Sequence, residues 1–308
     1  MIRGSVPRRN VRAVAGLTLG VRESPAIPSR DTARMQRNPQ AEQMADESMA
    51  RNLALQAQAI WPQEERLFDR YALSGALRIL DLGCGTGEIT RRLATRYPQA
   101  QVLGIDVLES NLVPARRDST AFGERIRYEV GDAFALAAAD ARFDLVVCRH
   151  VSQAVPDFGL VIGEIARVLV PGGWVHLVSE DYGMLHMPVG SLDPDRFWNG
   201  NAIAYLAGIG CDGRIGRHTP PLLDIAGFTD IAMDYVTVDT LRVPRATFAG
   251  ILAAWRDGYA GVLAEASERG IDQVDADFDT MITAVMTPPA YAVWHVPVVS
   301  GRKAMETR

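Results

Sequence analysis

The sequence predicts an α/β fold, with a doubly wound and mostly parallel sheet of about seven strands and helices on both faces. Three observations predict it. Strand-like apolar segments alternate with helix-like segments between residues 79 and 178, which is typical of consecutive βαβ units. The first of these strands runs directly into a glycine-rich turn. The chain has 308 residues, of which 48% are hydrophobic, enough for one large α/β domain with insertions.

The first strand and its turn read ILDLGCGTG over residues 79–87. Glycine lacks Cβ, so it adopts positive φ at little cost and lets a ligand lie against the backbone. A helix expected over 88–97 directs its N-terminal amides at the same place. The spacing differs from the G-x-G-x-x-G of dinucleotide sites, because Glu88 stands at the position of the last glycine. An acid there repels a pyrophosphate but suits a zwitterionic amino acid end, whose ammonium group Asp81 can engage.

Acidic residues also close the second and third strands. The second strand, 102–106, ends in Asp106, and a carboxylate at this place can accept both hydroxyls of a ribose. The third strand, 126–130, leads into Gly-Asp-Ala-Phe, in which Asp132 suits the exocyclic amine of adenine and Phe134 suits a contact with the ring. The carboxyl edge of the sheet is therefore expected to bind an adenosine group.

The remaining strands complete the predicted sheet. A fourth strand at 143–148 is followed by a helix at 160–169, which leads through a Pro-Gly-Gly turn to a fifth strand at 174–178. Two later strands are expected at 229–238 and 291–299.

In this order and spacing, the motifs DLGCGTG, GID, GDAF and LVPGGW resemble the class I S-adenosylmethionine-dependent methyltransferases over about residues 53–179. The resemblance implies a Rossmann-like seven-stranded sheet whose last strand is antiparallel, and S-adenosylmethionine as cofactor. It implies that Asp81 and the glycines line the methionine and sulfonium part, Asp106 the ribose and residues 132–134 the adenine. The expected cofactor-binding residues are Asp81, Gly83, Cys84, Gly85, Gly87, Asp106, Val107, Asp132, Ala133, Phe134 and Arg149.

Segments outside this core are expected to form the substrate side. Residues 41–60 are amphipathic, and the helix that they predict either covers the cofactor or simply packs on the sheet. Helical insertions are expected at about 183–226 and 244–288, the second with a helix at 248–268. Four aromatic residues of the substrate side are expected to contact the substrate, namely Tyr182, Trp198, Tyr205 and Trp255. The expected organisation is a disordered arginine-rich extension at 1–37, a helical cover at 38–70 and a methyltransferase domain at 71–308.

Candidate catalytic residues follow the fourth and fifth strands. Ligands of open α/β sheets bind beyond the carboxyl ends of the strands, so Glu180, Asp181 and His186 are expected near the transferred methyl group, with His150 beside the cofactor. A hydroxyl or ammonium acceptor benefits from a general base. His186 and His150 are the candidates, with Asp181 as base or orienting group. The alternative for either histidine is a packed residue without a catalytic part, and a carbon or thiolate acceptor can react without a base.

The composition of the chain limits the kinds of molecule that it is expected to bind. The first 37 residues hold eight arginines against two acids, and the whole chain has a net charge of −5, so the rest is strongly acidic and a poor surface for nucleic acid. The arginine-rich segment is either a nucleic-acid or targeting tail, a disordered extension, or residues ahead of a true start at Met35. No apolar run is long enough to span a membrane. Three cysteines without a C-x-x-C pair and no metal-ligand spacing favour a reducing cytoplasm and no metal.

The acceptor is expected to be a small, partly apolar metabolite. Methyltransferases that act on bases or side-chain amides commonly carry an (N/D)PP(Y/F) element after the fourth strand, where this chain reads Cys-Arg-His-Val at 148–151. The prediction is a methyl transfer to oxygen or nitrogen, or else to sulfur or carbon, in secondary metabolism. Two alternatives stay open: a regulatory or cyclase-like protein that binds the cofactor without transfer, and an NAD(P)-dependent oxidoreductase. The sequence leaves the oligomeric state open.

Overall fold

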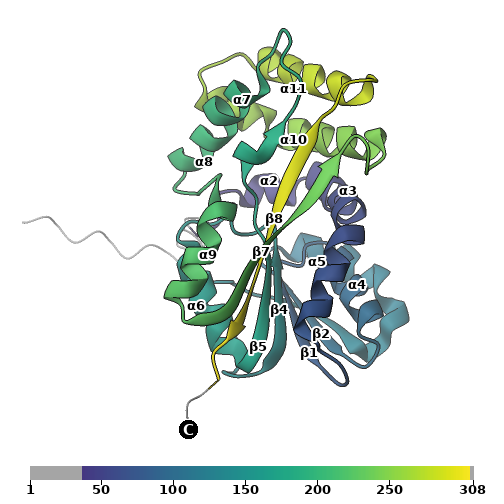
Figure 1. Cartoon of the computed structure of the whole chain (residues 1–308), viewed down its shortest axis with the longest axis vertical. Coiled ribbons are helices and arrows are strands. Elements are labelled where there is room, and N and C mark those ends of the chain that lie inside the picture. The colour runs from purple at the N-terminus through teal and green to yellow at the C-terminus, as the bar shows by residue number, and fades with distance from the viewer. Residues whose placement is uncertain (1–36, 306–308) are drawn as a thin grey trace, which may run out of the picture.

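The computed structural model describes residues 37–305 as an eight-stranded sheet with helices on both faces and a helical layer beyond one edge (Figure 1). The strand order is β3-β2-β1-β4-β5-β8-β6, and β7 pairs with β8. The predicted extension at 1–37 lies outside the described residues except for Arg37. The strands are β1 Arg78–Leu82, β2 Gln101–Asp106, β3 Ile126–Val130, β4 Phe143–Arg149, β5 Leu169–Val178, β6 Leu185–His186, β7 Phe228–Asp239 and β8 Val293–Lys303.

The sheet has the predicted Rossmann-like topology. Strands β1 to β5 pair in parallel, whereas β8 is antiparallel to both β5 and β7. The last strand therefore lies between two earlier ones, as predicted. The two-residue strand β6, which pairs with the start of β8, was not predicted because so short a segment carries no periodic signal.

Alternate side chains of the central strands feed two separate cores, as expected for strands buried on both faces. Ile79 and Val147 pack with α3 Glu47–Glu64 and α4 Glu88–Arg96 on one face. Leu80 and Val146 pack with α6 Phe158–Val168 and α9 Ile215–Ile225 on the other. The helix predicted at 160–169 is α6, and β5 begins already at Leu169 because that residue pairs with Phe143 of β4. Helix α5 Glu109–Asp118 packs on β2 and β3.

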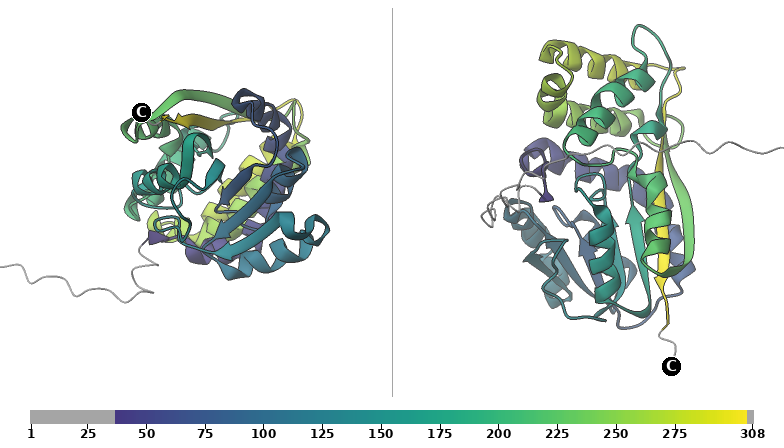
Figure 2. Two further views of the ribbon diagram at one scale, coloured as in Figure 1. Left: turned by 90° about the horizontal axis from the view of Figure 1, so that it is seen from below. Right: turned by 90° about the vertical axis from the view of Figure 1, so that its left-hand side faces the viewer.

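A layer of helices lies beyond the carboxyl ends of the parallel strands, as Figure 2 shows from the side. The helix predicted at 248–268 is present as α10 Arg245–Ala266, and a second long helix, α11 Ile271–Met286, was not predicted. Helix α10 packs directly on α3, because a side chain at Gly250 or Gly258 would meet Leu55 or Ser48 of α3 within 2.9 Å. The layer comprises α7 Pro194–Phe197, the π-helix η4 Trp198–Ile203, α8 Ala204–Gly208, α10 Arg245–Ala266 and α11 Ile271–Met286.

The single helix predicted at 41–60 is two helices, α2 Ala41–Ala45 and α3. The break falls at Asp46, whose extended backbone ends α2 and whose side chain accepts a hydrogen bond of 2.8 Å from the Ser48 amide at the start of α3. Aspartate is a favoured N-cap for this reason. Helix α3 runs through Pro62 to Glu64 and continues as the 3-10 helix η1 Glu65–Tyr71. The other short 3-10 helices are η2 Thr120–Arg125 and η3 Tyr182–Met184.

Two glycines on helices of the same face provide a test of the packing beside the site. A Cβ at Gly216 of α9 would lie 2.6 Å from Pro297 Cγ and 2.8 Å from the Ser179 carbonyl oxygen, whereas a Cβ at Gly163 of α6 meets nothing within 4 Å. We expect Gly216→Ala to lower the free energy of unfolding by about 1–3 kcal/mol through overpacking. Gly163→Ala should raise it by about 0.5–1 kcal/mol through helix propensity.

Urea denaturation of both variants and the parent chain measures the two changes. Equal shifts in the same direction would contradict the close contact between α9 and the ends of β5 and β8.

Candidate functional site

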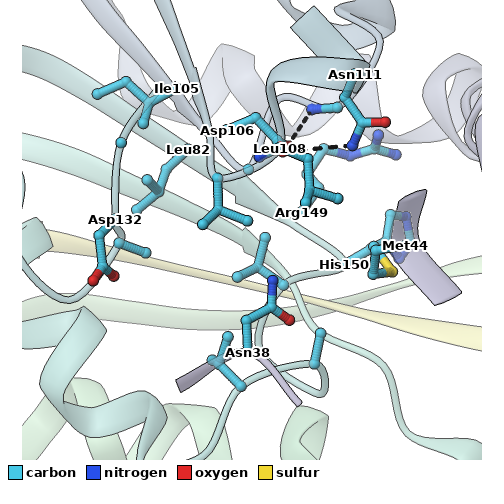
Figure 3. Close-up of a pocket in the computed structure, with 18 of the residues that line it drawn as sticks. Asn38, Met44, Leu82, Ile105, Asp106, Leu108, Asn111, Asp132, Arg149 and His150 are labelled. Carbon is cyan, nitrogen blue, oxygen red and sulfur yellow. Dashed lines mark hydrogen bonds between the residues drawn. The ribbon is translucent and has the colours of Figure 1, made fainter. Parts of the chain in front are cut away.

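A pocket opens at the carboxyl ends of the parallel strands, directly below the helical layer. In Figure 3, Asp132 lies at one end, Met44 and His150 lie at the other, and Asp106 lies between them. Its empty space, open mouth included, is about 820 Å³, which is within the range of small-molecule and cofactor sites. Eight of the eleven predicted cofactor-binding residues line it, namely Gly83, Gly85, Asp106, Val107, Asp132, Ala133, Phe134 and Arg149.

The glycine loop forms the floor of this pocket and is tightly covered. Gly83 and Gly85 have φ angles of +73° and +52°, which residues with a Cβ rarely adopt. A Cβ at Gly83 would also lie 2.2 Å from Val151 Cγ2, and one at Gly85 would lie 2.6 Å from Leu53 Cδ1 of α3. Glycine is therefore needed in the loop for two reasons. The backbone adopts positive φ angles, and α3, which covers the loop, approaches it too closely to leave room for a Cβ.

Asp106 joins the loop to the end of β2. Its carboxylate accepts hydrogen bonds of 2.9 Å from the amides of Gly85 and Leu108, and one of 3.4 Å from the Asn111 side chain. Burial raises the pKa of Asp106, and these hydrogen bonds act in the opposite direction. The carboxylate is thus held in a fixed orientation on the pocket wall, where its remaining lone pairs can accept further hydrogen bonds.

Three predicted cofactor residues lie outside the lining. Asp81 is buried and accepts a hydrogen bond of 2.6 Å from the Thr90 hydroxyl of α4. Burial raises the pKa of Asp81 to about 6. Cys84 is a buried thiol beside Gly104, and Gly87, at φ +77°, is the N-cap of α4. These residues support the loop from below.

Arg149 connects the pocket to a buried charge network. It lines the pocket, and its Nη2 lies 2.9 Å from Glu64 Oε2 at the end of α3. Glu64 Oε1 lies 3.0 Å from His176 Nε2, and His176 Nδ1 lies 2.6 Å from the Tyr71 hydroxyl. Burial raises the pKa of Glu64, but the charge of Arg149 and the hydrogen bond from His176 outweigh it and hold this pKa at about 2. Arg149 Nε has no hydrogen-bond partner within the described residues.

The Asp132 end of the pocket carries a tight turn. Asp132 Oδ1 accepts a hydrogen bond of 2.9 Å from the Phe134 amide. Arg37 lies 3.4 Å from the other carboxylate oxygen and stacks over the Phe134 ring, 5.6 Å from its centroid. The residues before α2 therefore close this end of the pocket from above.

His150 stands at the opposite end, immediately after β4. Its backbone has a φ of +56°, a conformation that is uncommon outside glycine and is often found at functional sites. Its Nδ1 lies 2.9 Å from Glu180 Oε1, to which Gln56 of α3 also donates a hydrogen bond of 3.4 Å. His150, Glu180 and Gln56 are all buried, and His150 Nε2 has no hydrogen-bond partner in the described part of the chain.

This pair has the geometry of a base and its orienting acid. An ionised carboxylate only accepts hydrogen bonds, so Nδ1 of His150 carries the hydrogen toward Glu180. In the neutral ring, Nε2 then has a free lone pair. His150 also lines the pocket, so the arrangement can accept a proton there.

The other predicted catalytic residues lie elsewhere. His186 is exposed and lies 3.5 Å from Asp195 in a polar hollow outside the pocket at the strand ends. Asp181 is buried, and Arg217 donates two hydrogen bonds to it, at 2.5 and 2.9 Å. Asp181 also accepts one from the Gly183 amide, and it contacts neither His150 nor His186 through these bonds. All four predicted substrate residues, Tyr182, Trp198, Tyr205 and Trp255, line one second pocket beneath α10.

A sequence model of the methyltransferase domain matches residues 79–173. A ubiquinone biosynthesis O-methyltransferase from Leptothrix cholodnii is 40% identical over 137 residues, which are 39% of this chain and 57% of that protein. The protein of the same name from Bordetella pertussis is 30% identical over 172 residues, which are 50% of this chain and 70% of that protein. The chain belongs to the class I S-adenosylmethionine-dependent methyltransferases.

Solved structures agree with this methyltransferase fold. Phosphoethanolamine N-methyltransferase 2 from Haemonchus contortus, in complex with S-adenosylmethionine, has a TM-score of 0.54 and is 19% identical, with 91% of this chain and 61% of that chain covered. This likeness concerns the fold alone. S-adenosylmethionine is the cofactor of this methyltransferase family, to which the chain belongs. The match to the Leptothrix relative spans little more than half of that protein's length.

The described residues form neither a metal-binding cluster nor a membrane-spanning helix. Between residues 37 and 305, no three side chains of His, Cys, Asp or Glu gather in a way that could hold a metal ion. Over the same range, no helix of the methyltransferase has both the length and the apolar character needed to cross a bilayer.

The sequence did not predict which residues hold His150 and Arg149 in place. Gln56 and Glu64 lie on α3 in the helical repeat of Leu53 and Ile60, so they face the sheet. Polar residues within an otherwise apolar stripe were the available signal. Glu180 was placed at the end of the fifth strand, but its contact with His150 depends on the pairing of β4 with β5.

The buried carboxylate of Asp81 predicts a pH-dependent stability in the cofactor-free methyltransferase. Burial raises its pKa to about 6 in the folded chain, against roughly 4 when unfolded. The folded state therefore holds the proton more tightly, and stability falls as the pH rises from about 4 to 6. We expect Asp81→Asn to raise the free energy of unfolding by about 2–3 kcal/mol at pH 8 and by little at pH 4.

Urea denaturation at the two pH values measures this difference. Asp224→Asn, at an exposed position of α9, is the control. An effect of Asp81→Asn that is equal at both pH values would contradict the raised pKa.

Proposed function

We propose that the protein transfers a methyl group from S-adenosylmethionine to an oxygen or nitrogen atom of a small metabolite, with His150 as the general base. The observation that carries this proposal is the buried His150–Glu180 pair, whose unpartnered Nε2 belongs to a residue of the cofactor pocket wall. Family membership supports the cofactor, and the pair supports an acceptor that must lose a proton.

The residues of the pocket fit this cofactor. Arg149 offers a buried Nε without a partner among the described residues, which suits the carboxylate of the methionine part. Asp106 suits the ribose hydroxyls, and Phe134 with Asp132 suits the adenine. When bound, the cofactor supplies an electrophilic methyl group on its sulfonium and leaves as S-adenosylhomocysteine.

The chain's own residues would act on the acceptor. Nε2 of His150 accepts the proton that the acceptor loses as its oxygen or nitrogen gains the methyl group. Glu180 holds the imidazole in one tautomer and stabilises the imidazolium that forms, as an orienting acid does. Gln56 in turn holds Glu180. Alignment of the acceptor by the surrounding walls supplies much of the remaining rate enhancement.

The setting that we propose is the cytoplasm and secondary metabolism. All three cysteines are buried free thiols, which is usual in a reducing compartment. The described helical layer over the carboxyl edge of the sheet gives the chain a shaped substrate side, which suits a tailoring enzyme. The names of the two relatives reported above concern ubiquinone biosynthesis, so a phenolic precursor of a quinone is a second kind of acceptor to assay.

A cofactor-binding protein without transfer would share the same pocket. Calorimetric titration with S-adenosylhomocysteine, and with NADH in a parallel cell, tests the cofactor. Release of S-adenosylhomocysteine during incubation with S-adenosylmethionine and a panel of phenols and amines tests the transfer. Tight binding without turnover on any acceptor would favour the regulatory or cyclase-like alternative, and binding of NADH alone would overturn the proposal.

The ribose assignment predicts the behaviour of Asp106→Ala. The variant loses the carboxylate that is fixed by Gly85 and Leu108, so its affinity for S-adenosylhomocysteine should fall several-fold or more. Calorimetry measures the change, and Asp224→Ala, at an exposed position outside the pocket, should bind like the parent. Unchanged affinity of Asp106→Ala would contradict the assignment.

The base assignment predicts a contrast between two acid-to-amide substitutions. Glu180→Gln weakens the orientation of His150, so kcat should fall about tenfold or more while affinity for S-adenosylhomocysteine stays near that of the parent. Asp195→Asn alters the partner of His186 and should leave kcat near that of the parent. Initial rates with an active acceptor from the panel measure both variants, and the reverse order of effects would assign the base to His186.

A further inference from the structure

The second pocket lies on the substrate side and is walled mainly by aromatic rings. Its empty space, including its opening, is about 350 Å³, near the lower end of the range for small-molecule sites. Ala202, Leu206 and Leu263 fill the gaps between the rings. The rings belong to Tyr182, Trp198, Tyr205, Trp255, Tyr259 and Phe278.

The rings form a rigid, flat-sided wall. Tyr182 and Trp198 are nearly parallel, at 7° with 5.7 Å between centroids. Trp255 stands edge-on to both, at 73° and 76°. Such edge-to-face packing is favourable and fixes the rings relative to one another. A flat molecule would be held by these walls through stacking and edge contacts, without rearrangement of the side chains.

Among the described residues that line this pocket, none carries a formal charge. Its polar groups are the Gln40 amide, the tyrosine hydroxyls and the indole N–H of Trp198, which is buried and has no hydrogen-bond partner within residues 37–305. Burial raises the pKa of Tyr182 and of Tyr259, so both stay neutral. An isolated negative charge would be costly here, whereas a neutral hydrogen-bond acceptor can bind the unpartnered indole N–H of Trp198.

The pocket adjoins the His150–Glu180 pair. The charge of Glu180 acts on both Tyr182 and Tyr259, which places its carboxylate near their hydroxyls. The ring of Trp294 lies 5.3 Å from that of Trp255 and 6.5 Å from that of His150.

Gln40, just before α2, and Met44, within α2, connect the two pockets. Tyr259 donates a hydrogen bond of 2.9 Å to Gln40 and contacts Met44 Sδ at 3.7 Å. Gln40 lines the aromatic pocket, and Met44 lines the cofactor pocket, beside His150 in Figure 3. The amide of Gln40 also donates a hydrogen bond of 3.1 Å to the Gln153 carbonyl, three residues after His150.

We infer that this aromatic pocket binds the methyl acceptor, and that the acceptor is an uncharged, flat aromatic molecule whose hydroxyl points toward His150. The inference rests on the proposed function and narrows its substrate class. A polar hollow on the other side of Tyr182 and Trp198, with Arg214, Arg217 and His186 in its walls, is where a negatively charged acceptor would bind instead.

Three probes that share one ring system and differ in charge test the inference. We would titrate 2-naphthol, 2-naphthoate and 2-naphthyltrimethylammonium into the full chain saturated with S-adenosylhomocysteine and measure binding by calorimetry. The neutral naphthol should bind at least about tenfold more tightly than either ion, a difference of about 1.4 kcal/mol. Equal or tighter binding of an ion would overturn the inference, and loss of naphthoate binding in Arg214→Gln would assign the acceptor to the polar hollow.

A matched pair of substitutions locates the bound naphthol. Ala202→Phe fills the pocket and should weaken naphthol binding about tenfold or more, whereas Ala207→Phe, at an exposed position of the neighbouring α8, should not. Unchanged affinity for S-adenosylhomocysteine confirms that each variant is folded. If Ala202→Phe does not fold, Tyr205→Ala, which removes a half-buried wall, replaces it with the same expectation. Naphthol binding that neither substitution weakens would overturn the inference.

Methyl transfer is read separately from binding. Release of S-adenosylhomocysteine from S-adenosylmethionine in the presence of 2-naphthol would support both proposals. Naphthol that binds in the aromatic pocket without being methylated, together with no turnover on the wider panel, would leave the pocket assignment intact and contradict the proposed transfer.

Discussion

The arrangement of the site depends on one fully buried carboxylate. Glu64, at the end of α3, is held between Arg149 of β4 and His176 of β5. Loss of one partner from a buried ion pair commonly costs about 3–5 kcal/mol, because the other charge is left without compensation. The contact therefore ties α3 firmly to the sheet at one position, and it also fixes the guanidinium of Arg149 on the wall of the cofactor pocket.

Because α3 is fixed at this end, the rest of the helix is placed over the site. Leu53 lies on Gly85 of the loop, and Gln56 reaches Glu180. On its outer side, the helix packs against α10 at Gly250 and Gly258, where the two helices come close together. A single helix thus contributes to the cover of the cofactor pocket, to the support of the His150–Glu180 pair and to the attachment of the helical layer.

The sequence could predict the features of the fold and the site that depend on residues close together in the chain. The glycine turn, the acid at the end of β2 and the parallel strands each depend on a few consecutive residues, so the core of the fold and eight cofactor-binding residues of the pocket lining were predicted. The pairing of His150 with Glu180 depends on neighbouring strands 30 residues apart. The contact of Glu64 with His176 spans 112 residues, and no periodicity reports such a distance. The sequence indicated His186 as a candidate base as strongly as His150, because the burial of a loop residue cannot be predicted from its position in the sequence. In the structure, His186 is exposed and lies beside Asp195.

The short segment before α3 belongs to both pockets. Asn38 and Met44 line the cofactor pocket, Gln40 lines the aromatic pocket, and Tyr259 and Gln153 hold Gln40 in place. A ligand that shifts this segment in one pocket necessarily changes a wall of the other. For such a ligand, the affinities of the two pockets would be thermodynamically linked, and the linkage would be mutual: each ligand would change the affinity of the other by the same factor.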